Sequence, residues 1–158
     1  AGVTLNLEIV NRFESNMLNT AAQGMAYIRD TGASNVLLHL DTFHMNIEEA
    51  DVGLAIRHAA DKIGYLHIGE SHRGYLGTGT IDFTVIFDAL TAIGWDDYVT
   101  FESFSTIVDK DLSLKTAIWR NLWADNVALA RHAHRFIELG LETARLKQAL
   151  VQEAHLPG

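Results

Sequence analysis

The sequence predicts an α/β protein built as half of a parallel (β/α) barrel of the TIM type, with four β/α units followed by C-terminal helices. Short apolar, strand-like runs alternate with helical segments, which is the pattern of parallel βαβ units. Each of four runs ends in a residue that can bind a metal ion or transfer a proton: Glu8, Asp41, His67 and Glu102. These residues are spaced about thirty residues apart, which is the length of one β/α unit.

The first unit and the second strand follow from local patterns. The segment Val3–Val10 keeps a partial alternation of apolar and polar residues, so we expect a strand there. A helix is expected over Thr20–Asp30, ending at Gly32, a residue suited to the left-handed position after a helix. The next strand, Asn35–Leu40, is almost continuously apolar, which is typical of a parallel strand covered on both faces.

The middle of the chain supplies the second helix and the third unit. A helical stripe predicts a helix over Ile47–Lys62, closed by Gly64. A third strand is expected at Tyr65–Ile68, and the glycine-rich loop Gly69–Gly79 follows it. The next helix is predicted over Ile81–Ile93 because its apolar residues recur at helical spacing.

The fourth strand is expected at Tyr98–Phe104, and from Leu114 onward the chain is predicted to be helical, interrupted near Gly140. An open dinucleotide-binding sheet would need a GxGxxG motif after its first strand, and the sequence has none there. The polar residues at every strand end favour a barrel instead.

Length and composition limit the classes of protein. The chain has 158 residues, no cysteine and 48% apolar residues, so we expect a single domain over residues 1–158 with a core of its own. A complete TIM barrel has eight units and about 250 residues, so the chain is expected to be part of something longer that begins before Ala1. The formal charge of −8 argues against nucleic acid or an anionic membrane as a partner. No apolar run has the length of a membrane span and no leader pattern opens the chain, which favours a cytoplasmic location.

The four strand-end residues predict a metal centre. All strands of a parallel barrel open with their carboxyl ends onto one face, where active sites are built. We therefore expect Glu8, Asp41, His67 and Glu102 to converge. Three carboxylates and one imidazole suit Mn²⁺, Co²⁺ or Mg²⁺ better than the thiolate-rich sites of structural zinc.

Each of these residues also has a simpler structural interpretation. A glutamate in a strand is usually exposed or paired with a cation, Asp41 could cap the next helix, and His67 could be a core histidine. The repeated placement favours the joint functional interpretation. Glu8 and Glu102 lie on the first and fourth strands and could act on opposite sides of a substrate carbon, one removing a proton and the other returning one. A metal ion that polarises the neighbouring oxygen atoms would make that carbon more acidic.

Three further residues, Glu14, His44 and Arg73, lie a few positions beyond a predicted ligand, on loops that would cover the site. They could form hydrogen bonds with the hydroxyl and carbonyl oxygens of a polyol. Arg73 is also a candidate for an ordinary surface salt bridge, and Glu14 for a charge near a helix N-terminus.

Four segments of the sequence resemble the ketose 3-epimerase family, which includes D-tagatose, D-psicose and L-ribulose 3-epimerases. They are LEIVNRFE at 7–14, HLDTFHMNIEE at 39–49, HIGESHRGYLGTG at 67–79 and FESF at 101–104. The resemblance extends to about residue 125. It implies a xylose-isomerase-like TIM barrel of which this chain is the C-terminal half, with four further β/α units before Ala1.

The resemblance also implies an activity and the residues that carry it out. The implied reaction is epimerisation of a free ketose at C3 through a cis-enediolate. The implied cofactor is a divalent metal ion, with Mn²⁺ as the first choice. Glu8 and Glu102 match the acid/base pair on opposite faces of C3, and together with Asp41 and His67 they match the metal ligands. Residues that match those holding the carbonyl end of the sugar are Glu14, His44 and Arg73.

Other interpretations stay open at this point. An aldose–ketose isomerase of the same superfamily would use the same metal and an enediol, and a dehydratase of cyclic polyols is a further relative. A non-catalytic half-barrel that binds metal or sugar is the alternative from another class. The partner expected besides the ketose is either a second copy of the chain, giving a homo-oligomer, or the missing N-terminal half barrel.

Overall fold

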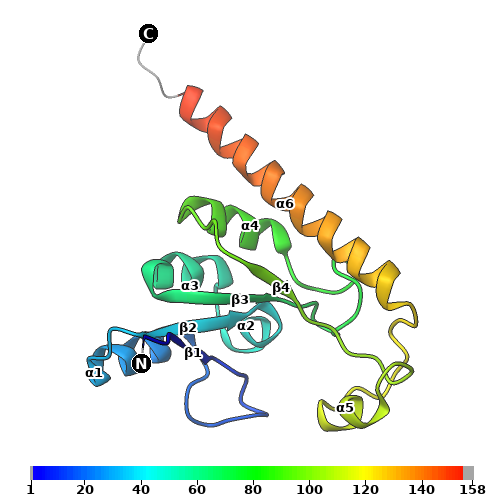
Figure 1. Ribbon diagram of the computed structural model, residues 1–158. Coiled ribbons are helices and arrows are strands. Elements are labelled where there is room, and N and C mark those ends of the chain that lie inside the picture. The colour runs from blue at the N-terminus through cyan, green and yellow to red at the C-terminus, as the bar shows by residue number, and fades with distance from the viewer. Residues whose placement is uncertain (1, 155–158) are drawn as a thin grey trace.

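A four-stranded parallel sheet forms the centre of the computed structural model, which describes residues 2–154 (Figure 1). The strands lie in the order β1-β2-β3-β4, which is also their order along the chain. Their bounds are Leu5–Glu8 for β1, Val36–Asp41 for β2, Ile63–Ile68 for β3 and Val99–Phe101 for β4. Successive parallel strands joined through helices make a sector of a β/α barrel, so the predicted fold class is confirmed. Residues 1 and 155–158 of the expected single domain lie outside the described residues.

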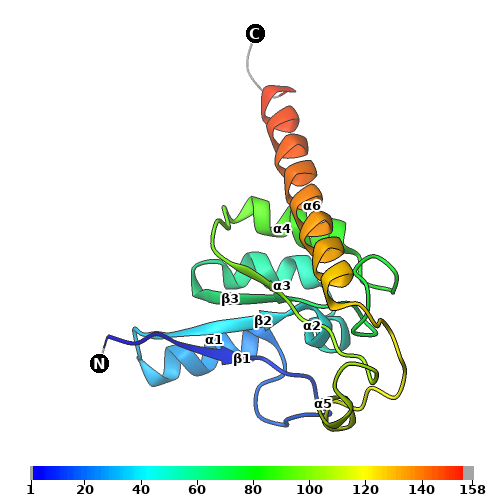
Figure 2. The same ribbon diagram turned by 45° about the vertical axis from the view of Figure 1, so that its right-hand side comes forward.

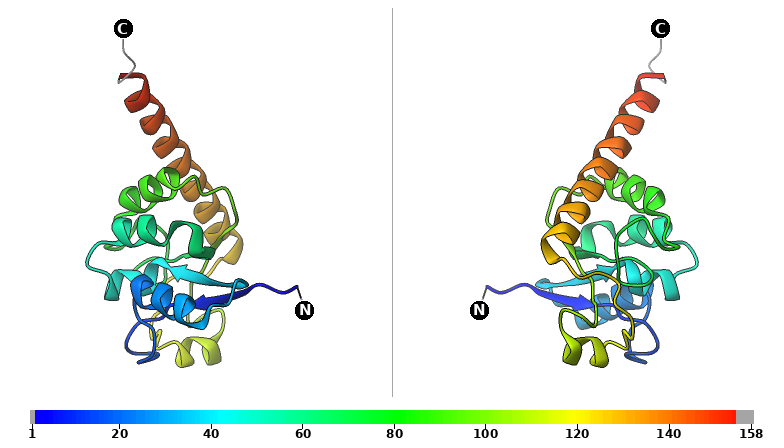
Figure 3. Two further views of the ribbon diagram at one scale, coloured as in Figure 1. Left: turned by 90° about the vertical axis from the view of Figure 1, so that its left-hand side faces the viewer. Right: turned by 90° about the vertical axis from the view of Figure 1, so that its right-hand side faces the viewer.

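Three helices cover one face of this sheet (Figure 3). They are α1 (Ala21–Thr31), α3 (Val52–Ala59) and α4 (Phe83–Ala92), and each contacts the next. The expected end of α1 is confirmed, because Gly32 follows the helix with a φ of 64°, and at its start Thr20 and Gln23 form a reciprocal capping box. These helices position the sheet by burying its apolar face.

Side-chain alternation along the central strands separates the core from the site. Leu38 and Leu40 on β2 are fully buried in the apolar cluster, as are Leu66 and Ile68 on β3. Because successive side chains of a strand point to opposite faces, the intervening polar residues lie on the other face of the sheet. That second face of β2 and β3, which would line the inside of a barrel, is therefore polar.

The segment predicted as one helix over Ile47–Lys62 is two helices. The first, α2 (Thr42–Glu48), follows β2 without a break, and α3 begins after Asp51, whose Oδ1 accepts a hydrogen bond of 2.8 Å from the Leu54 N–H. The short 3₁₀ helix η1 (Ala60–Lys62) then leads directly into β3, so Gly64 lies inside that strand. An aspartate that caps a helix start divides the expected helix.

The C-terminal region differs most from the prediction. A short helix, α5 (Lys110–Lys115), is followed by an irregular segment over 116–125, and the long helix α6 (Asn126–Ala154) starts only after it. No break occurs at Gly140; a Cβ atom there would lie 2.2 Å from Cε2 of Phe87 on α4, so this glycine allows the two helices to approach closely. Beyond this contact α6 extends away from the sheet (Figure 2). No helix among residues 2–154 has both the length and the apolar character needed to cross a membrane.

Candidate active site

The ends of the four strands bring the predicted metal ligands to one edge of the sheet. Glu8 and Asp41 are the last residues of β1 and β2, and the register of the sheet pairs Asp41 with His67 on β3. Glu102 directly follows β4, and its N–H donates a hydrogen bond of 3.1 Å to the Ile68 carbonyl. His67 Nδ1 consequently lies 3.8 Å from Asp41 Oδ2 and 3.7 Å from Glu102 Oε2.

This arrangement fits a divalent cation. The Nδ1 atom of His67 is buried and has no hydrogen-bond partner among the described residues, so this nitrogen is available to a cation. Asp41, His67 and Glu102 offer three ligand atoms that lie within 4.8 Å of one another. Glu8 is not in that group; it forms a neighbouring group of the same kind with Asp41 and His44. The structure therefore places three predicted ligands together and the fourth beside them.

Arg73 is buried in this site and is not a surface residue, which excludes the surface salt bridge as its interpretation. Only 4% of the residue is exposed. Its Nη1 donates to Asp41 Oδ2 at 2.9 Å, and its Nη2 lies 3.0 Å from Glu102 Oε2. The guanidinium also stacks over the ring of Phe43, at 4.0 Å from the centroid. Arg73 thus links two carboxylates of the site from its loop after β3.

The loop after β3 holds Arg73 through its backbone. Arg73 has a φ of 61°, in the left-handed region that is uncommon for residues other than glycine. Its carbonyl accepts hydrogen bonds from the Phe104 N–H at 3.1 Å and from the Ser103 hydroxyl. Earlier in the loop the buried carboxylate of Glu70 accepts from the N–H groups of Ser71 at 2.8 Å and Gly77 at 2.9 Å. These bonds fix the loop that carries the guanidinium.

The loop between β1 and α1 carries Glu14 and is attached to α2. The Arg12 N–H donates to Glu48 Oε1 at 2.7 Å, and the Arg12 guanidinium contacts both oxygens of the same carboxylate at 2.9 and 3.0 Å. His44 on α2 is buried; its Nε2 lies 3.8 Å from Glu8 Oε1 and its Nδ1 lies 3.8 Å from Glu14 Oε1. The three residues predicted to hold the sugar, Glu14, His44 and Arg73, therefore lie next to the predicted metal ligands.

A cavity of about 540 Å³ lies over these side chains. Its polar wall includes Glu8, Glu14, His44, Arg73 and Glu102, whereas Asp41 and His67 are not among the lining residues. Its lining also includes residues 115–118 at and after the end of α5 and three aromatic side chains, Phe13, Phe43 and Phe104. Such a space is large enough for a monosaccharide.

The two outer carboxylates are in different electrostatic environments. Burial raises the pKa of Glu8, and the negative charges of Asp41 and Glu102 raise it further. Contact with His67, together with the positive charge of Arg73, lowers the pKa of Glu102 to about 2 against the opposing effect of burial. Glu8 is thus the more easily protonated of the pair, and different protonation states suit a proton removed by one carboxylate and supplied by the other.

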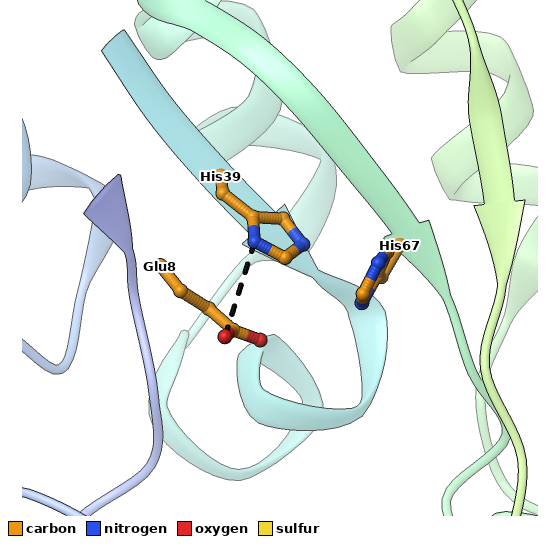
Figure 4. Close-up of side chains that lie close together, drawn as sticks. All are labelled: Glu8, His39 and His67. Carbon is orange, nitrogen blue, oxygen red and sulfur yellow. Dashed lines mark ion pairs between the residues drawn. The ribbon is translucent and has the colours of Figure 1, made fainter. Parts of the chain in front are cut away.

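Sequence reasoning did not single out His39, which lies between two predicted ligands (Figure 4). Its Nδ1 is 3.9 Å from Glu8 Oε2, and its ring centroid is 4.2 Å from that of His67. Burial, followed by the neighbouring His67, lowers the pKa of His39 to about 4, so the imidazole is neutral at neutral pH. The sequence spacing could have indicated His39, since it stands two residues before Asp41 and a strand places both side chains on the same face.

Comparison with known proteins gives consistent matches. A model of the xylose isomerase-like TIM barrel family matches residues 1–143. The L-ribulose 3-epimerase of Mesorhizobium japonicum (strain LMG 29417 / CECT 9101 / MAFF 303099) is 77% identical over 158 residues, covering 99% of this chain and 53% of that protein. The ketose 3-epimerase of Arthrobacter globiformis is 54% identical over 137 residues, covering 86% of this chain and 47% of that protein.

Solved structures match in the same way. A structure of L-ribulose 3-epimerase has a TM-score of 0.93 and 76% identity, covering 99% of this chain and 53% of that one. The D-allulose 3-epimerase from Methylomonas sp., solved in complex with D-allulose, has a TM-score of 0.83 and 50% identity, covering 87% of this chain and 48% of that one. The chain spans about half the length of the curated relatives it matches.

Proposed function

Because the chain belongs to the xylose isomerase-like TIM barrel family, we propose that it is the metal-binding and proton-transferring half of a ketose 3-epimerase. The observation that carries the proposal is the convergence of Asp41, His67 and Glu102 at the strand ends, with Glu8 beside them. Relatives that act as L-ribulose and ketose 3-epimerases support the choice of reaction. The substrate class is a free ketopentose or ketohexose.

The metal in this proposal is a divalent cation held by Glu8, Asp41, His67 and Glu102, with Mn²⁺ as the first choice and Co²⁺ or Mg²⁺ as alternatives. When bound, such an ion polarises the carbonyl and hydroxyl oxygens next to the reacting carbon. The short distances from His67 Nδ1 to Asp41 Oδ2 (3.8 Å) and to Glu102 Oε2 (3.7 Å) support this choice of ligands. Glu8 needs only a side-chain movement to join them, because it is 39% exposed and lies at the edge of the cavity.

The proton transfer belongs to Glu8 and Glu102, which come from the outer strands β1 and β4. One carboxylate removes the proton from C3, and the electron pair of that C–H bond moves toward the C2 carbonyl to give a cis-enediolate. The other carboxyl group then donates a proton to the opposite face of C3, and the carbonyl re-forms. In this proposal Glu14, His44 and Arg73 bind the carbonyl end of the sugar and keep C3 between the two carboxylates.

Hydrogen exchange in D₂O tests the proposal. The chain, supplied with Mn²⁺, is incubated with D-fructose, D-tagatose and L-ribulose, and the sugars are analysed by NMR. We expect deuterium at C3 together with the C3 epimer. Exchange at C1 or C2 with an aldose product would show an aldose–ketose isomerase instead. Tight metal binding without exchange in any sugar would reduce the chain to a non-catalytic metal-binding half.

A further inference from the structure

A buried asparagine outside the predicted site residues contacts the imidazole of His44. Asn11 is 2% exposed and stands at the start of the loop that carries Glu14. Its side-chain orientation is fixed by Phe13, whose N–H donates a hydrogen bond of 2.9 Å to Asn11 Oδ1. The amide nitrogen must then point the other way, where Asn11 Nδ2 lies 2.8 Å from His44 Nδ1.

The same ring nitrogen receives a second hydrogen bond. The backbone N–H of Asn11 donates to His44 Nδ1 at 3.3 Å. A backbone N–H can only donate, so Nδ1 must offer its lone pair, and a neutral imidazole carries its single proton on the other nitrogen. The carboxylate of Glu14, at 3.8 Å from Nδ1, is beyond hydrogen-bond distance and does not compete as an acceptor. Two contacts from one residue therefore select the Nε2–H form of His44.

The Nε2–H group lies in the candidate site. His44 Nε2 is 3.8 Å from Glu8 Oε1, and His44 lines the cavity. We infer that Asn11 is a positioning residue that holds His44 in the Nε2–H tautomer, so that the ring offers a hydrogen-bond donor to a substrate oxygen beside Glu8. The opposite tautomer would present a lone pair to that oxygen and to the Glu8 carboxylate. The identity of the acceptor rests on the proposed function, whereas the tautomer does not.

Nitrogen chemical shifts of the imidazole report the tautomer directly. The chain is labelled with ¹⁵N-histidine, and the His44 signals are assigned by their loss in His44→Gln. At mildly alkaline pH we expect Nδ1 to show the shift of an unprotonated nitrogen and Nε2 that of a protonated one. A protonated Nδ1 in the wild-type chain overturns the inference without any variant of Asn11.

Asn11→Asp tests whether this residue sets the tautomer. The aspartate keeps nearly the same shape and can still accept the Phe13 N–H, but it presents an oxygen in place of the NH₂ group to His44. We expect the His44 proton to appear on Nδ1, because a carboxylate oxygen in the position of the 2.8 Å contact outweighs the longer backbone contact of 3.3 Å. Asn19→Asp is the matched control, because Asn19 lies on the same loop and its Nδ2 donates instead to the carbonyls of Val10 and Ser15, each at 2.8 Å.

The outcomes separate positioning from a general effect on the loop. A proton shift to Nδ1 in Asn11→Asp but not in Asn19→Asp supports the inference, and unchanged His44 shifts in Asn11→Asp overturn it. With an active enzyme, Asn11→Asp should lower kcat/KM for the ketose about 10- to 100-fold, the range typical of losing a group that orients a site residue. An equal loss in Asn19→Asp would assign the effect to the loop and overturn the positioning role. If the tautomer changes as expected but no C3 exchange occurs even in the wild-type chain, the proposed function fails while the role of Asn11 in setting the tautomer stands.

Discussion

The division of work between the two outer glutamates can be tested one residue at a time. Glu102→Gln keeps the shape of the side chain but cannot remove a proton, so we expect C3 exchange to fall at least about 10²-fold. Metal binding should weaken less, because Asp41 and His67 remain as ligands. Deuterium incorporation and a Mn²⁺ titration followed by EPR measure the two effects separately.

Glu138→Gln is the matched control for this change. Glu138 lies on α6, is 67% exposed on its side chain and pairs only with His134 among the contacts of the described residues. The control should keep the exchange rate of the wild-type chain. If Glu102→Gln also keeps full exchange, the two-carboxylate mechanism is wrong.

The buried carboxylate of Glu70 is a second test at the residue scale. Burial by itself would raise the pKa of Glu70, but hydrogen bonds from Ser71, Ile81 and Gly77 lower it below its ordinary value of 4.5. Glu70→Gln turns an NH₂ group toward backbone donors, so we expect the free energy of unfolding to fall by about 1–3 kcal/mol. Urea denaturation measures this change, and Glu142→Gln on the exposed surface of α6 should have almost no effect.

The pH dependence of the same variant follows from the lowered pKa. The unfolded chain takes up the proton of Glu70 at higher pH than the folded chain does, so this contribution to stability is present above about pH 4.5. It is lost as the pH falls through the lower pKa of the folded state. The wild-type chain should therefore lose more stability than Glu70→Gln between pH 5 and pH 3. Parallel curves for the two proteins over that range would contradict the assignment.

Residue identity and strand period were sufficient to predict that four candidate ligands converge. Glu8, Asp41, His67 and Glu102 could be placed together because each lies at or next to the end of a parallel strand, and the structure places them at one edge of the sheet. The helix-cap interpretation of Asp41 is confirmed, since its Oδ1 accepts from the Phe43 N–H at the start of α2, while its Oδ2 binds Arg73. The sequence could not show the contacts that depend on loop conformation.

Two such contacts illustrate the limit. The burial of Arg73 depends on its left-handed backbone conformation and on the bonds to its carbonyl from the loop after β4. The contact between Asn11 and His44 joins the loop after β1 to helix α2, and the two residues are 33 positions apart in the sequence. No periodic pattern encodes either arrangement.

At the scale of the elements, apolar periodicity located strands and helices but not all of their ends. The expected strands and the helices α1 and α4 are present because their apolar stripes face the core. Two of the errors came from residues whose role depends on a neighbour. Asp51 caps a helix and so divides the segment Ile47–Lys62, and Gly140 was interpreted as a breaker although it serves a helix crossing.

Gly140→Ala tests this account of α6. Alanine is better than glycine in a helix interior by about 1 kcal/mol. Its Cβ atom, however, would lie 2.2 Å from Cε2 of Phe87, which is 4% exposed and cannot move freely. We therefore expect a net loss of about 1–3 kcal/mol in the free energy of unfolding, the usual cost of overpacking. The double variant Gly140→Ala/Phe87→Leu, with a smaller residue at position 87, should recover part of this loss. A gain in stability from Gly140→Ala alone would show that α4 and α6 pack loosely where they cross.

At the scale of the whole molecule, a metal ion bound by the proposed ligands should stabilise the fold by joining the ends of the four strands. A ligand that binds the folded chain alone stabilises it by about 2.7 kcal/mol when present at 100 times its Kd. We expect Mn²⁺ to raise the Tm and EDTA to reverse the effect. His67→Gln should lose most of this increase, because the buried Nδ1 of His67 has no other partner among the described residues and is the nitrogen ligand of the proposed site. An equal Tm increase in His67→Gln would place the ion elsewhere.

Among the described residues, the two outer strands of the sheet, β1 and β4, have unpaired edges. Within residues 2–154, β1 and β4 each pair with a neighbour on one side only, and Leu5 on β1 is 55% exposed. An unpaired apolar edge strand is a template for another strand. We expect these edges to be covered by the strands of another half barrel or, in the chain by itself, by a second copy of the chain.

Sedimentation velocity over a range of concentrations tests which surface associates. The wild-type chain should show association that increases with concentration, and Leu5→Lys, which places a charge on the β1 edge, should weaken it. Leu150→Lys is the control on α6, where another large apolar side chain is 65% exposed far from the sheet. If Leu150→Lys abolishes association and Leu5→Lys does not, the contact runs through α6. The β1 edge, which ends at Glu8 beside the cavity, would then stay free for a strand of another half barrel.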